Sequence, residues 1–167
     1  MLCGNVVGLT CSCLSFILGL TGILSDYWLV NFGSGLFHEG IWQQCTNNVC
    51  AKITGRAYID ATRALLILST VMLLSAMLFS CLTFLSFHAG KFTASLLAGT
   101  MEVLSAIFLI IGMVVYTLET AHNVLNSSYN YQWSFFLCWT SGVLITVAAT
   151  SHILAHKSTP QAGYESM

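Results

Sequence analysis

Four long apolar segments constrain the fold of this chain more than any other feature of its sequence. Glu102 is the only Asp, Glu, Lys or Arg within them, and they cover residues 5–25, 64–87, 92–118 and 133–155. Each has about 20 to 27 residues, enough for a helix to cross about 30 Å of hydrocarbon. None shows the two-residue alternation of a transmembrane strand. The pattern predicts an all-α membrane protein, a bundle of four transmembrane helices packed through small residues.

The composition excludes a water-soluble monomer. Charged residues make up 7% of the chain and hydrophobic residues 56%, with a mean hydropathy of +0.80, whereas soluble domains carry about 25% charged residues. A net charge of −1 argues against nucleic-acid binding. The first apolar segment lacks the basic flank of a signal peptide, so we expect it to stay in the protein as a helix.

The connecting segments indicate an orientation. Lys and Arg counts in loops 26–63 and 119–132, in the tight turn 88–91 and in the tail 156–167 are too even to decide it. Cys45 and Cys50 have the spacing of a hairpin closed by a disulfide, which needs an oxidising compartment. Asn126 begins an N-glycosylation sequon with Ser127 and Ser128. We therefore expect both loops to be extracellular or luminal and both termini to be cytosolic.

The first of these loops carries a motif. Aromatic and β-branched residues at 28–32 and around residue 42 predict short strands near the membrane surface. The motif continues into the second apolar segment and consists of Trp28, Gly40, Trp42, Cys45, Cys50 and Arg63. The chain thereby resembles the claudin, peripheral myelin protein and epithelial membrane protein family of tetraspan proteins. The resemblance implies a four-helix bundle capped by a small extracellular β-sheet.

Details of the motif indicate which branch of the family the chain resembles. Ile41 stands where the family has leucine, and the short cysteine spacing differs from that of claudins proper, which argues against a paracellular pore. That spacing and the stretch from Asp60 to Ala64 resemble the lens-fibre branch of the family. Tyr116-Thr117 and the stretch from Trp133 to Phe135 resemble both that branch and the natural-killer-granule branch. The motif residues either hold the loop sheet on the bundle, the interpretation we favour, or contact a partner directly.

The C-terminus carries a candidate sorting signal. Gly163 and Tyr164 precede Glu165, Ser166 and Met167, which gives a Y-x-x-Φ sequence at the end of the chain. Such a peptide binds in extended form, adding to a sheet edge while two side chains fill pockets. It resembles the tails of lysosomal membrane proteins and predicts a clathrin-adaptor subunit as partner. The alternatives are a disordered tail that no partner recognises and a PDZ ligand ending at Met167.

Glu102 is a carboxyl inside a predicted transmembrane helix, which makes it a candidate functional residue. Three interpretations stay open: a hydrogen-bonded group that holds the helices together, a contact to a partner helix, and part of a proton or ion path. Side chains predicted to lie at the same depth are candidate hydrogen-bond partners, namely either Ser12 or Ser15, together with Ser75 and Thr146.

Three further features have ordinary interpretations beside functional ones. His152 and His156 have a spacing used by metal ligands, but no third ligand lies near them in sequence, so no metal site is predicted. Cys3, at the cytosolic boundary, is either palmitoylated or an ordinary thiol. Gly4 and Gly8 form a GxxxG pattern that serves packing within the bundle or dimerisation.

The sequence holds no phosphate loop, nucleophile elbow or catalytic carboxylate pair, so we predict neither an enzyme nor a cofactor. The tail favours a tetraspan of lysosome-related or secretory granules, acting in granule trafficking or exocytosis. The cysteine spacing favours, as an alternative, a structural or adhesive protein of the plasma membrane. A second alternative is an accessory subunit of a channel or transporter. Besides the lipid bilayer, the expected partners are the adaptor and either a second copy or another membrane protein.

Overall fold

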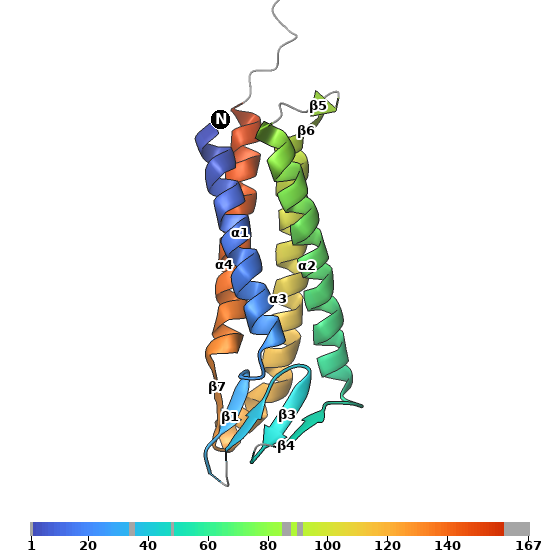
Figure 1. The fold of residues 1–167 in the computed structure, drawn as a ribbon, viewed down its shortest axis with the longest axis vertical. Helices are drawn as coiled ribbons and strands as arrows, with labels where there is room; N and C mark the ends of the chain where they lie inside the picture. The colour runs from blue at the N-terminus through green and yellow to red at the C-terminus, as the bar shows by residue number, and fades with distance from the viewer. Residues whose placement is uncertain (1, 34–35, 48, 85–87, 90–91, 159–167) are drawn as a thin grey trace, which may run out of the picture.

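Four helices form an elongated bundle, and a small sheet covers one end of it (Figure 1). The computed structural model describes residues 2–33, 36–47, 49–84, 88–89 and 92–158. All four helices are long and apolar enough to cross a membrane. They are α1 (Leu2–Leu24), α2 (Ala57–Phe84), α3 (Ala94–Asn126) and α4 (Trp133–Lys157). The predicted fold class is confirmed.

The helices pack mainly in two pairs, α1 against α4 and α2 against α3. Small residues allow α1 to approach α4 closely. A Cβ built on Gly4 would lie 3.1 Å from the Cβ of Ala155, and one built on Gly22 would lie 2.7 Å from the Sγ of Cys138. Gly4 and Gly8, the GxxxG pattern, both face α4. The pattern therefore serves packing within the bundle in this structure.

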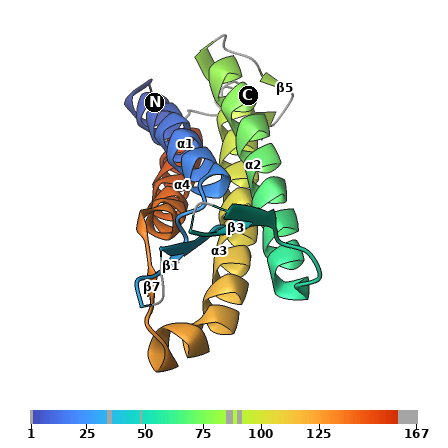
Figure 2. The same cartoon turned by 60° about the horizontal axis from the view of Figure 1, so that its bottom comes forward.

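The sheet has five antiparallel strands in the order β4-β3-β2-β1-β7. Figure 2 shows it crossing the end of the bundle, from β7 beside α4 to the strands that lead into α2. Four strands come from the predicted first loop and one from the third. Their bounds are β1 (Leu29–Asn31), β2 (Phe37–Glu39), β3 (Gln43–Thr46), β4 (Val49–Lys52) and β7 (Tyr129–Tyr131).

The described ends of the chain lie together, because α1 begins and α4 ends at the end of the bundle away from the sheet (Figure 1). The short strands β5 (His88–Ala89) and β6 (Phe92–Thr93) pair at that same end. They replace part of the predicted tight turn at 88–91, whose residues 90–91 lie outside the described residues.

Several predicted boundaries were wrong. Helix α2 begins at Ala57 rather than at residue 64, with Asp60 in its first turn, where a carboxylate suits the helix dipole. The residues 85–87 assigned to it lie outside the described residues. Helix α3 runs to Asn126 rather than to residue 118. Its extra turns leave the apolar segment and contact the sheet, where the Oγ1 of Thr120 lies 2.9 Å from the hydroxyl of Tyr131.

Candidate functional site

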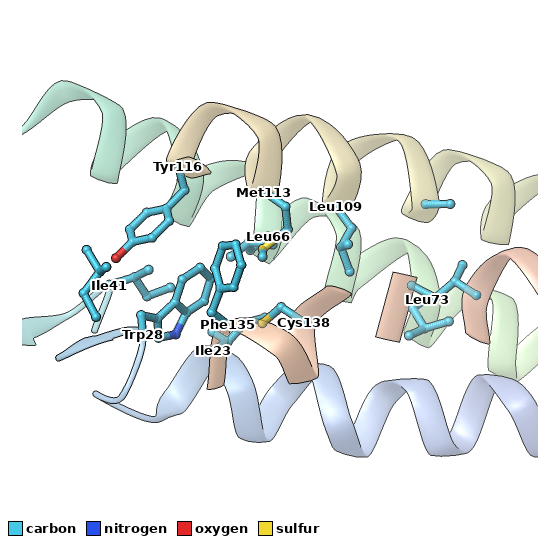
Figure 3. Packing of buried hydrophobic residues seen from close by; sticks show 13 residues of the cluster. Ile23, Trp28, Ile41, Leu66, Leu73, Leu109, Met113, Tyr116, Phe135 and Cys138 are labelled. Atoms are coloured by element: carbon cyan, nitrogen blue, oxygen red, sulfur yellow. The ribbon is translucent and has the colours of Figure 1, made fainter. Parts of the chain in front are cut away.

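Trp28 is the central residue of the contact between sheet and bundle. Its side chain is fully buried and lies beside Tyr116 and Phe135 (Figure 3), with its ring centroid 4.9 Å from that of Tyr116 in an edge-on arrangement. The indole Nε1 donates a hydrogen bond of 2.8 Å to the carbonyl of Gly22. An aromatic ring buried this way stabilises the contact, and its N–H needs the partner it finds.

Trp42 makes a similar hydrogen bond to the next carbonyl of α1. Its indole Nε1 donates to the carbonyl of Ile23 at 2.9 Å. The last carbonyls of a helix have no partner within the helix, so the two tryptophans of the motif satisfy consecutive carbonyls at the end of α1. Gly40 lies against the following turn: a Cβ built on it would lie 2.6 Å from the Cα of Asp26. Only glycine fits that approach.

Arg63 joins the sheet to α2. Its Nε donates to the carbonyl of Ile41 at 2.7 Å, and one terminal nitrogen donates to the carbonyl of Ile53 at 3.0 Å. The other terminal nitrogen pairs with Asp60 at 2.6 Å, and the guanidinium lies 5.2 Å from the centre of the Trp42 ring. A fixed fork of donors is what arginine offers and lysine lacks. The motif thus connects α1, α2 and the sheet.

The disulfide predicted from the sequence is confirmed, because Cys45 and Cys50 are bonded. The two residues are directly opposite each other on β3 and β4. Asn126 is exposed at the end of α3. Strand β7 of the disulfide-carrying sheet follows α3 after two residues, and the sheet lies at one end of the bundle (Figure 1). The sequon and the disulfide would therefore be exposed to the same compartment. Glycosylation of Asn126 stays a prediction.

We expect glycosidase treatment of the cell-expressed protein to increase its gel mobility, because the exposed sequon lies at the same end of the bundle as the disulfide-closed sheet. The substitution Asn126→Gln should abolish the shift. Asn123→Gln is the matched control, since Asn123 is also exposed on the last turns of α3 but begins no sequon. A wild-type protein with no shift would contradict both the modification and this support for the orientation.

Glu102 is fully buried in a polar cluster at the half of the bundle away from the sheet. One carboxylate oxygen lies 2.9 Å from the Nδ1 of His152, and the other lies 2.5 Å from the hydroxyl of Ser12. The Nε2 of His152 lies 2.8 Å from the hydroxyl of Ser80. Helices α1, α2, α3 and α4 each contribute one side chain. We call Ser12, Ser80, Glu102 and His152 the four-helix polar cluster.

The cluster is chemically self-contained. His152 is also fully buried, and both of its ring nitrogens have partners. Buried polar groups are stable when they are hydrogen-bonded, and the carboxyl of Glu102 and the imidazole of His152 both meet that condition. A Cβ built on Gly8 would lie 2.5 Å from the imidazole ring of His152, so the backbone of α1 packs directly against this side of the ring.

Of the predicted partners of Glu102, the alternative Ser12 is confirmed, and the others bond elsewhere. Ser15 pairs with Ser141 at 2.9 Å, and Ser75 and Thr146 donate to carbonyls of their own helices. His152 was not predicted as a partner of Glu102, although it bonds the carboxylate at 2.9 Å. A signal existed, because α3 and α4 are antiparallel: Glu102 near the start of one helix and His152 near the end of the other fall at similar depth.

The other predicted site residues lie apart from this cluster. His156 contacts Thr93 at 2.8 Å rather than sharing a ligand with His152. Over the described part of the chain, no group of three His, Cys, Asp or Glu side chains is placed to hold a metal. Cys3 is exposed near the start of α1, and its palmitoylation stays a prediction. Gly163, Tyr164 and Met167 lie outside the described residues.

Four membrane-spanning helices capped by a disulfide-closed sheet define a multi-pass, claudin-like tetraspan membrane protein. The chain belongs to the PMP-22/EMP/MP20/Claudin family, whose family model matches residues 2–149. The resemblance drawn from the loop motif is thereby confirmed.

Individual relatives are similar over most of their length. Human lens fiber membrane intrinsic protein is 28% identical over 157 residues, which is 90% of each chain. Protein NKG7 of Bos taurus is 24% identical over 168 residues, 99% of this chain and 98% of its own. Claudin domain-containing protein 2 of Mus musculus is 24% identical over 152 residues, 91% of this chain and 84% of its own.

Proposed function

We propose that this protein is a non-enzymatic tetraspan of lysosome-related or secretory granules that acts in granule trafficking or exocytosis. The observation that carries the proposal is the C-terminal sequence from Gly163 to Met167. Tyr164 follows Lys157, the last residue of α4, by seven positions. A tyrosine signal this close to the membrane is within reach of a clathrin-adaptor subunit on the membrane surface.

The fold agrees with the proposed direction of the tail. Both described chain ends lie at the end of the bundle away from the disulfide (Figure 1). A disulfide forms in an oxidising compartment, so the tail would face the cytosol, where adaptors act. The peptide would bind as an added strand, with the side chains of Tyr164 and Met167 filling two pockets.

The test is the steady-state localisation of the wild type and of Tyr164→Ala beside a lysosome marker. We expect the wild type in acidic vesicles and most of the variant at the cell surface, because the adaptor pocket for the tyrosine ring would be empty. Ser166→Ala is the matched control: Ser166 stands between the two recognised positions, so this variant should localise like the wild type. Wild type and Tyr164→Ala both at the surface would contradict the proposal.

One observation favours a second candidate, a structural or adhesive protein of the plasma membrane. Large apolar side chains are exposed at the sheet end, with Phe32 67%, Val49 75% and Leu125 81% accessible. Apolar side chains outside the membrane are a feature of protein contacts. Accumulation of both wild type and Tyr164→Ala at cell–cell contacts would favour this candidate. The accessory-subunit alternative rested on Glu102 and on the exposed helix faces. Glu102 has its partners within the bundle, whereas apolar side chains of the helices are exposed.

A further inference from the structure

Glu39 is a buried carboxyl in the sheet, separate from the four-helix polar cluster. It is the last residue of β2 and only 5% exposed. A terminal nitrogen of Arg56 donates to its Oε1 at 2.8 Å. The Arg56 side chain is 40% exposed and also donates to the Oε1 of Gln44 at 3.2 Å. The ion pair thus connects β2 and the segment that leads into α2, with one partner buried and the other half in solvent.

The surroundings of Glu39 disfavour its negative charge. Burial raises the pKa of the Glu39 carboxyl, and the attraction of Arg56 lowers it by less, so the pKa lies above its ordinary value. The other titratable groups facing this region are phenols, Tyr58 of α2 and Tyr116 of α3, whose buried hydroxyl has no partner among the described residues. Glu119 of α3 adds a further acidic group near Tyr58. Among the described residues, Arg56 is therefore the one cation that stabilises the carboxylate of Glu39.

We infer that Glu39 and Arg56 form an acid-sensitive ion pair, in which a proton from the solvent binds the Glu39 carboxyl and releases the Arg56 guanidinium to the surface of the sheet end. The inference goes beyond the proposed function and holds for the folded chain in any compartment. An acidic lumen would supply the proton if the granule assignment is right. The connection between β2 and α2 would then rest on neutral hydrogen bonds.

The sign of the pH effect follows from the direction of the pKa. A carboxyl whose pKa is higher in the folded state binds its proton more tightly there than in the unfolded state. The folded protein with neutral Glu39 is therefore the more stable form, and the contribution of this group to stability rises as the pH falls. Glu39→Gln imitates the protonated state at every pH.

The first measurement is the midpoint of thermal unfolding, in detergent, of wild type and Glu39→Gln between pH 7.5 and 5. We expect the variant to unfold at a higher temperature than wild type at pH 7.5, and the difference to shrink as the pH falls, because the pKa of Glu39 is raised in the folded protein. Glu119→Gln, which changes an exposed carboxyl of α3, is the control and should keep a constant difference from wild type. A difference for Glu39→Gln that does not change with pH would overturn the inference.

The second measurement tests the release of Arg56. Phenylglyoxal modifies free guanidinium groups, and the chain contains only two arginines, Arg56 and Arg63. At pH 7.5 we expect severalfold faster modification of Arg56 in Glu39→Gln than in wild type, measured by mass spectrometry. Arg63, which keeps its three acceptors, is the internal control. Equal Arg56 rates in the two proteins would overturn the inference. If the variant fails to fold, carboxyl ¹³C titration of glutamate-labelled wild type decides, because the pKa of Glu39 must then lie above the ordinary value of a glutamate.

Discussion

Glu102→Leu is expected to lower the free energy of unfolding by about 3 kcal/mol, because it removes one half of a buried polar pair. The leucine leaves the Nδ1 of His152 without its hydrogen-bond partner at a fully buried position. In a chain of this size each kcal/mol corresponds to about 2–4 °C in the unfolding midpoint. Thermal unfolding in detergent, followed by tryptophan fluorescence, should therefore show a midpoint lowered by roughly 6–12 °C.

Two variants separate the polar pairing from other effects of the substitution. Glu102→Gln keeps a side chain of the same size that can bond Ser12 and His152, so we expect a loss of less than about 1 kcal/mol. Glu119→Leu, which changes an exposed carboxyl on the same helix, should be close to neutral.

A double-mutant cycle tests whether Glu102 and His152 act as a pair. Removing both partners leaves neither one buried without a hydrogen bond. Glu102→Leu combined with His152→Leu should therefore cost clearly less than the sum of the two single substitutions. Additive costs would show that the two side chains contribute independently, and the interpretation of the cluster as one unit would be wrong.

The sequence predicted the membrane architecture well because that part of the fold depends on local properties. A run of apolar residues long enough to cross the bilayer must be helical, since no water is present to bind the backbone. The extent of the apolar segments did not predict where the helices begin and end. Helix α3 continues past the apolar segment to Asn126 because its last turns pack on the sheet through Thr120. Hydropathy reports where a chain enters the membrane, whereas tertiary contacts decide where the helix ends.

Contacts between segments far apart in the chain were the second feature that the sequence did not predict. The disulfide between Cys45 and Cys50 could be predicted, because both residues lie in one hairpin. Strand β7 was missed, since it joins the sheet only through β1, about a hundred residues earlier in the chain. The pairing of Glu102 with His152 depends likewise on how two helices rotate against each other. Depth along a helix can be counted from the sequence, but the direction a side chain faces within the bundle cannot.

Trp28→Ala is expected to destabilise the protein by about 3–5 kcal/mol, the usual cost of removing a fully buried large aromatic side chain. The indole fills the space between Tyr116 and Phe135 under the sheet (Figure 3) and bonds the carbonyl of Gly22. Loss of the indole leaves a cavity and also leaves the carbonyl of Gly22 without its hydrogen-bond donor. The unfolding midpoint should fall by roughly 6–20 °C, at about 2–4 °C for each kcal/mol.

The comparison with other tryptophan variants distinguishes the two interpretations of the loop motif. Trp28→Phe keeps most of the ring but loses the N–H donor, so about 1 kcal/mol should be lost. Trp133→Ala is the matched control, since Trp133 is 45% exposed and its removal should have a small effect. If Trp28→Ala proved as harmless as Trp133→Ala, the sheet would not depend on this anchor, and partner contact would be the better explanation of the motif. A large loss confined to Trp28 would mean that partner contacts must come from other residues, because a side chain fully enclosed between sheet and bundle has no surface left to offer.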